Sequence, residues 1–132
     1  MSISDDVILE QVEYTFDGAS NVILAVTRER SHNAVASQTG PLNDPSTTPK
    51  ARVTHVAFYH DGIGRVIATA DYGTNGGTVF SRSLTTPCVQ YAFADGSANT
   101  VRPTSITCPN GRVLDYSYST SGSMPDAVSR ID

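Results

Sequence analysis

Apolar and polar side chains alternate over residues 8–16, and this alternation is the first structural signal in the chain. One face carries Ile8, Val12, Tyr14 and Phe16, and the other carries Gln11, Glu13 and Thr15, with Glu10 as the exception. A period of two residues is typical of a β-strand with one buried face, so we expect a half-buried strand here. Asp17-Gly18 follows and tolerates the positive φ of a tight hairpin turn, and residues 22–26 begin the return strand. The first segment is therefore predicted to be a β-hairpin.

The strand pattern resumes after residue 52 and continues to residue 119. It predicts strands over residues 53–59, 65–72, 89–93, 101–107 and 112–119, while a glycine-rich turn over residues 73–77 leads into residues 78–83. Residues 28–50 lack any period, and their glycine and prolines among Ser, Thr and Asn predict an irregular surface loop. No segment has helical spacing. The fold class is therefore predicted to be all-β, built from successive antiparallel hairpins.

One short phrase returns at the predicted turns: Asp-Gly, a variable residue, a small residue, Asn or Arg, then Val. It occurs at residues 17–22 and 61–66, and in looser form at 95–101, 109–113 and 126–131. The residues expected to form these turns are Asp17, Gly18, Asp61, Gly62, Gly64, Arg65, Asp95, Gly96, Asn110, Gly111 and Arg112. Repetition of one unit predicts a single repeat domain over residues 1–132, with hairpin copies near 12–27, 52–72, 89–107, 107–119 and 126–132.

The phrase resembles the tandem units of the Rhs or YD-repeat family, in which Tyr-Asp is followed by Gly-Arg and an apolar strand residue. Residues 59–66 (YHDGIGRV) are the best match, and residues 70–77 and 109–116 also look like segments of bacterial YD-repeat proteins of planctomycete type. Three departures stand out: His60 replaces the usual Tyr, Ser20-Asn21 replaces Gly-Arg, and Cys108 occupies a position where an aromatic is expected.

The resemblance implies a strip or solenoid of antiparallel hairpins, as in family members that encapsulate a C-terminal effector or project from the cell surface. It therefore implies an extracellular or cell-surface location. The family's self-cleaving Asp-Pro motifs have no counterpart beyond Asn43-Asp44-Pro45 in the irregular loop, so no catalytic residue is carried over.

The composition of the chain limits the classes of partner that it is expected to bind. Charged residues make up 17% of the chain and the net charge is −4, so no basic patch is available for nucleic acid. The longest apolar run, residues 22–26, is too short to span a bilayer, and the acidic first six residues are not a signal peptide. Cys88 and Cys108 lack metal-ligand spacing; a disulfide between them is possible, but two unpaired buried thiols are the better expectation.

Catalytic and metal-binding alternatives have less support. His55 and His60, with Asp61, are the candidates for acid–base chemistry, but no nucleophile or orienting partner accompanies them. The aspartates occur one per turn, whereas a calcium loop needs several oxygen ligands close together, so turn formation explains them better. The tyrosines could form a sugar-binding platform, although aromatic residues on a sheet face more often form a core. We expect no catalytic residue, metal or cofactor.

The sequence therefore favours a non-enzymatic structural module of a YD-repeat-like β-shell or filament, acting by self-assembly or encapsulation. A hairpin ribbon cannot bury both its faces, and neither end resembles a capping repeat, so we expect a homo-oligomer. Its partners would be identical copies, or the rest of a longer repeat chain, joined through strand edges. The main alternative is a cell-surface module that binds glycans or proteins through exposed tyrosines and the 28–50 loop, and a hydrolase using His55 or His60 ranks last.

Overall fold

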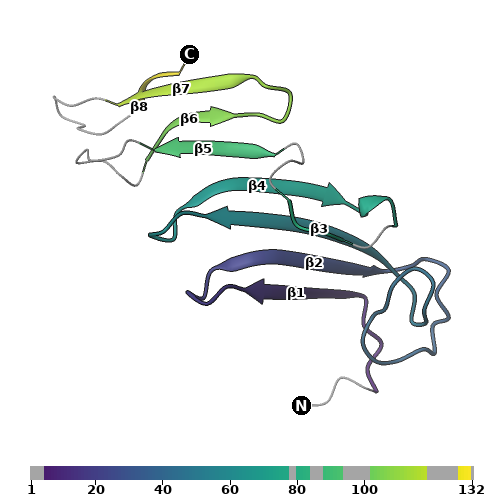
Figure 1. Cartoon of the computed structure of the whole chain (residues 1–132). Helices are drawn as coiled ribbons and strands as arrows, with labels where there is room; N and C mark the ends of the chain where they lie inside the picture. Colours follow the sequence, from purple (N-terminus) through teal and green to yellow (C-terminus); the bar gives the residue numbers. More distant parts are fainter. Residues whose placement is uncertain (1–4, 78–79, 84–87, 94–101, 119–127, 132) are drawn as a thin grey trace. The chain divides into compact units, whose positions relative to one another are not determined.

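The computed structural model describes residues 5–77, 80–83, 88–93, 102–118 and 128–131, and within them the chain is all-β. Eight strands follow in order: β1 (Glu10–Phe16), β2 (Val22–Arg30), β3 (Ala51–His60), β4 (Val66–Gly73), β5 (Val89–Phe93), β6 (Pro103–Thr107), β7 (Val113–Tyr118) and β8 (Val128–Ile131). Their order in the open sheet equals their order in the sequence (Figure 1). The registered pairs β1–β2, β2–β3, β4–β5, β5–β6, β6–β7 and β7–β8 are all antiparallel. The all-β hairpin prediction is confirmed.

Some predicted boundaries differ from the structure. Strand β2 continues to Arg30, so the irregular loop comprises residues 31–50 rather than 28–50. A short 3-10 turn, Asn75–Gly77, follows β4, and residues 80–83 form no strand. Residues 128–131, predicted as part of a fifth turn copy, are already the strand that pairs with β7. The third copy, including Asp95 and Gly96, and the start of the fifth lie outside the described residues.

The chain divides into two compact units, residues 1–57 with 71–82 and residues 58–70 with 83–132. Strands β3 and β4 contribute to both. The prediction of one repeat domain therefore stays a prediction, and each unit is described by itself.

In the first unit, the registers sort β1, β2 and the start of β3 into two faces. One face carries Glu13 of β1, its partner Val26 of β2 and the partner of Val26, His55 of β3. The residues two positions before and after each of these lie on the same face. The loop over residues 31–50 lies against this face, because the Leu42 amide donates to Gln11 Oε1 over 2.9 Å. The buried apolar residues of this unit are mostly small: Leu42, Ala51, Val53 and Ala57.

The described residues of the second unit bury equally little. Those that are apolar and buried are Tyr59, Ala68, Ala70 and Cys88, on β3, β4 and just before β5. Among the described residues of the chain, no large side chain is completely buried. The described parts of both units therefore have thin cores. Burial of large apolar side chains supplies most of the stability of a folded domain, and these parts contain little of it. None of the helical segments in the described part has the length and apolar character needed to cross a membrane.

Candidate functional site

The repeated phrase forms one defined turn, seen at residues 17–21, 61–65 and 108–112. In each copy the first residue donates its N–H to the carbonyl of the fifth, over 2.9, 3.0 and 2.8 Å. The fourth residue donates to the carbonyl of the first, over 3.1, 3.1 and 2.9 Å. That fourth residue has a positive φ in all three copies: 67° at Ser20, 86° at Gly64 and 82° at Gly111. This is the hairpin in which a β-turn is followed by a left-handed residue.

The residue with the positive φ is not the one that the sequence predicts. Asp17-Gly18 was expected to supply the positive φ of a two-residue turn, yet Gly18 and Gly62 lie outside the left-handed region. The conformation that favours glycine falls two residues later, on Gly64 and Gly111. In the first copy Ser20 adopts it without being glycine.

The first residue of the turn supplies the side-chain lock in two copies. Asp17 Oδ1 accepts from the amides of Ala19 and Asn21 over 2.8 and 2.9 Å. Asp61 Oδ1 accepts from the amides of Ile63 and Arg65 over 3.0 and 2.9 Å, in the same pattern. A carboxylate at this position therefore satisfies two amides that the turn leaves free.

Cys108 takes the position of this aspartate in the third copy. It makes the same two backbone hydrogen bonds, but the side-chain acceptor is now Asn110 Oδ1, which receives the Arg112 amide over 3.1 Å. The expectation that Cys108 replaces an aromatic residue is therefore wrong. The sequence pattern aligned Asn110-Gly111 with the Asp-Gly of the other copies. In the structure the residue equivalent to that Asp is Cys108, two positions earlier.

Asp61 also forms an ion pair within its turn. Arg65 Nε donates to Asp61 Oδ2 over 2.6 Å. Partial desolvation acts to raise the pKa of Asp61, but hydrogen bonds from the Arg65 side chain and from the amides of Arg65 and Ile63 outweigh it, and the pKa lies below its ordinary value. The carboxylate that pairs with Arg65 therefore lies in the same turn.

The same guanidinium also connects one hairpin to the next. Arg65 Cζ lies 4.5 Å from the centroid of the Phe93 ring at the end of β5. A cation over an aromatic face is attractive, more so where water is partly excluded. The aromatic residue before the predicted third turn therefore contacts the turn of the preceding hairpin.

The loop over residues 31–50 is held by one arginine that the sequence analysis did not single out. Arg30 donates to the carbonyls of Ile8, Val35 and Gln38 over 3.3, 2.7 and 2.9 Å. These bonds join the end of β2 to the segment before β1 and to the loop. Nothing in the loop's irregular sequence marks these carbonyls as acceptors, so only the structure could identify them.

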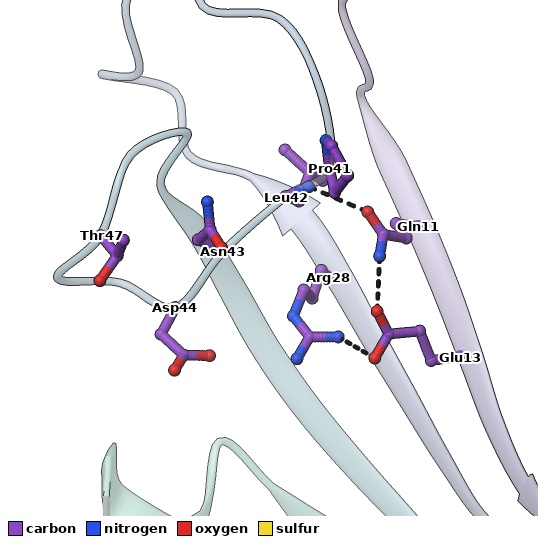
Figure 2. A pocket seen from close by; sticks show the side chains of 8 residues that line it. All are labelled: Gln11, Glu13, Arg28, Pro41, Leu42, Asn43, Asp44 and Thr47. Atoms are coloured by element: carbon purple, nitrogen blue, oxygen red, sulfur yellow. Dashed lines mark hydrogen bonds and ion pairs between the residues drawn. The ribbon is translucent and has the colours of Figure 1, made fainter. Parts of the chain in front are cut away.

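Where this loop crosses β1 and β2 it forms a polar cleft of about 250 Å³. Figure 2 shows the chain of contacts at its floor: Gln11 Nε2 donates to Glu13 Oε1 over 2.6 Å, and Arg28 donates to Glu13 Oε2 over 2.6 Å. Asn43, Asp44 and Thr47 of the loop form the opposite side. Two carboxylates, one guanidinium and two side-chain amides thus line one cleft.

A larger cleft of about 580 Å³ lies over the same sheet face. Its walls include Leu24, Val26 and Val53, and the ring of Phe80, which stacks on His55 at 4.8 Å between centroids and 2° between planes. His55 Nδ1 is buried without a hydrogen-bond partner. Stacking explains the position of His55 as a packing residue. Asp44, Ser46 and Thr74 also line this cleft, but the unpartnered His55 Nδ1 makes no hydrogen bond to any of them.

The remaining candidate residues do not form a reactive centre. His32 is exposed, whereas His60 is half-buried with its Nδ1 unpartnered. Within the described ranges, no three His, Cys, Asp or Glu side chains lie close enough together to hold a metal ion. Cys88 is buried and Cys108 half-buried, and both are free thiols. The register, with Gln90 opposite Thr107, explains this, because extending it places Cys88 and Cys108 on opposite faces.

Strand β1 exposes the face that was predicted to be buried. Val12, Tyr14 and Phe16 retain 41, 57 and 56% of their accessible surface. The Tyr14 and Phe16 rings lie 6.5 Å apart on this face. The prediction of a half-buried strand with this face inside is wrong, because the loop covers the polar face instead, through Gln11. The tyrosines do not form one platform, since Tyr59 is buried while Tyr14 is exposed.

Comparison with models of known protein families finds no match, and no curated protein matches the sequence.

Proposed function

We propose that this chain is a non-enzymatic structural module that acts by assembly through its strand edges, in the manner of a YD-repeat-like β-strip. The observation that carries the proposal is the repeated five-residue turn, built by the same two backbone hydrogen bonds at residues 17–21, 61–65 and 108–112. The feature that the three copies share is a backbone conformation. Repetition of one backbone conformation supports an architectural role.

The thin cores add a physical reason for assembly. No large side chain in the described residues is completely buried, while Val12, Tyr14 and Phe16 of β1 are exposed. Hairpins that bury so little gain stability when further strands extend the sheet. Identical copies, or further hairpins of a longer chain, would supply those strands, and the resemblance to YD repeats supports a location outside the cell or on its surface.

Light scattering and electron microscopy of the purified chain test this proposal. We expect oligomers or filaments whose mass grows with protein concentration. A species that remains strictly monomeric at high concentration would contradict it.

The polar cleft favours a second function, binding of a polar ligand such as a glycan or a peptide. Arg30 and Gln11 hold the loop in place over β1 and β2, so the cleft is partly preorganised. A glycan and peptide array is the direct assay. The function would be supported if Asp44→Ala weakens binding while Asp115→Ala, at an exposed position of β7, leaves it unchanged. An array without hits would exclude it for the ligands present.

A further inference from the structure

The outer edge of β1 combines free backbone groups with exposed apolar side chains. The Arg30 amide donates to the Leu9 carbonyl over 2.8 Å, which fixes the hydrogen-bonding phase of the β1–β2 ladder. Bonded and non-bonded pairs alternate along an antiparallel ladder, so positions 11, 13 and 15 bond to β2. The N–H and C=O groups of Val12 and Tyr14 therefore point outward. The Asp17 amide bonds back to Asn21, which leaves Phe16 in the outward phase as well.

These three residues are also the exposed apolar residues of the strand. An edge strand of this kind is a template for another strand unless charged side chains block it. In β1 the charged residues are Glu10 and Glu13, and both are acidic. Any partner strand must therefore match the apolar residues and keep its own carboxylates away from these two.

We propose, as a deepening of the assembly function above and resting on it, that β1 pairs with β1 of a second copy, antiparallel and centred on Tyr14. In this register Tyr14 faces its own copy, and Val12 faces Phe16 of the partner. All three pairs bring together outward backbone groups and apolar side chains, which is the arrangement that stabilises a sheet. On the other face Glu13 meets Thr15 and Gln11 meets Asp17, so no two carboxylates lie directly opposite each other.

Charge disfavours the neighbouring registers. A pairing centred on residue 13 places two Glu13 carboxylates directly opposite, and one centred on residue 15 places Glu13 opposite Asp17. A pairing centred on residue 12 places Glu10 opposite Tyr14. Parallel in-register stacking sets every glutamate beside its own copy. Like charges directly opposite each other are destabilising, so the Tyr14-centred register is the one that satisfies both the apolar and the acidic positions.

Cysteine cross-linking measures this register. In a Cys88→Ala/Cys108→Ser background that keeps the wild-type circular dichroism, Tyr14→Cys should form a disulfide-linked dimer on mild oxidation. Cα atoms of a bonded pair lie about 5.5 Å apart, within disulfide range. Thr15→Cys is the matched control on the same strand: it would be offset from its own copy by two residues, at roughly 8 Å, and should not cross-link.

Lysine substitutions on the outer edge of the same strand provide a second test of the interface. The double variant Val12→Lys/Tyr14→Lys should weaken self-association by about tenfold or more, because three apolar pairs are lost and cations face one another. Ile63→Lys is the control, since Ile63 is exposed in the turn between β3 and β4 and lies outside the interface.

The possible outcomes separate the two proposals. Cross-linking at Tyr14 but not Thr15, together with dissociation of the lysine variant, supports the interface. Assembly that persists in the lysine variant, or that cross-links equally at Thr15, overturns the β1 interface and leaves the assembly function standing. A wild-type chain that stays monomeric overturns both.

Discussion

At the scale of single residues, backbone conformation decides which positions of the repeated turn tolerate substitution. The fourth residue of each described copy has a positive φ, whereas the second does not. L-residues with a side chain lose roughly 1–2 kcal/mol in the left-handed region. The glycines of the two positions are therefore not equivalent, although they look alike in the sequence.

Gly111→Ala should lower the free energy of unfolding by about 1 kcal/mol, because its φ of 82° disfavours any side chain. A Cβ at Gly111 would meet no atom within 4 Å, so the cost is purely conformational. Gly18→Ala is the matched control: its site is equally open but lacks the positive φ, and the change should be neutral or slightly stabilising. Urea unfolding followed by circular dichroism provides the measurement, and equal losses in both variants would contradict this account.

Ser20 offers the reverse test at the same turn position. Its φ of 67° is one that glycine adopts freely. We expect Ser20→Gly to raise the urea midpoint or leave it unchanged, in contrast to an ordinary Ser→Gly change, which destabilises the chain. A clear fall in the midpoint would show that the Ser20 side chain contributes more than its conformational cost.

Asp61 should contribute to the pH dependence of stability. Its pKa in the folded state lies below the usual value, which is about 3.9 in an unfolded chain. A depressed carboxyl pKa stabilises the fold above the unfolded pKa, and this stabilisation is lost as pH falls through the folded pKa. Asp61→Asn should therefore flatten the acid side of a plot of melting temperature against pH below about pH 4.

Asp115→Asn is the control for that measurement. Asp115 is exposed on β7 and makes no side-chain hydrogen bond or ion pair within the part of the chain that the structure describes. Its variant should follow the wild-type profile. If both variants change the acid side equally, the Asp61–Arg65 interaction is not its cause.

At the scale of elements, alternation in the sequence predicts where strands form, but it does not predict which face of a strand is covered. The period of two in β1 correctly assigns Val12, Tyr14 and Phe16 to one face. It cannot say which face becomes covered, because that depends on where the 31–50 loop docks. Gln11 and Arg30 decide the docking through polar contacts with distant backbone groups, and such contacts leave no periodic signal.

The turn copies show a similar limit. The repeated phrase correctly locates the hairpins at residues 17–21 and 61–65. Cys108 could not be assigned to the first position of its copy from residue type, because the conserved element there is a pair of backbone hydrogen bonds. The cleft at Glu13 and Arg28 was likewise not predicted, since the loop that completes it lacks a recognisable motif.

Arg30→Met should release the loop from the end of β2. Three carbonyls would lose a charged donor, an effect on the order of 1–3 kcal/mol. We expect faster amide hydrogen exchange and earlier proteolytic cleavage within residues 31–41. Arg52→Met is the control, because Arg52 is exposed and reaches Glu29 only at 4.0 Å, an interaction worth little. Equal protection of the loop in both variants would contradict the role of Arg30.

At the scale of the whole molecule, the repeated turns, the thin cores and the open apolar face of β1 are related features. Each hairpin provides little buried surface, so its stability depends on adjacent strands. Strand β1 has no neighbouring strand on its outer side within the described residues. The proposed self-association through that edge would meet the same physical requirement that stacks the hairpins inside one chain.

Sedimentation velocity of the wild-type chain over a wide range of concentrations tests this central claim most directly. The account predicts that the sedimentation coefficient rises with concentration, and that Val12→Lys/Tyr14→Lys lowers it while Ile63→Lys does not. A single species with the mass of one chain at every concentration would contradict the account.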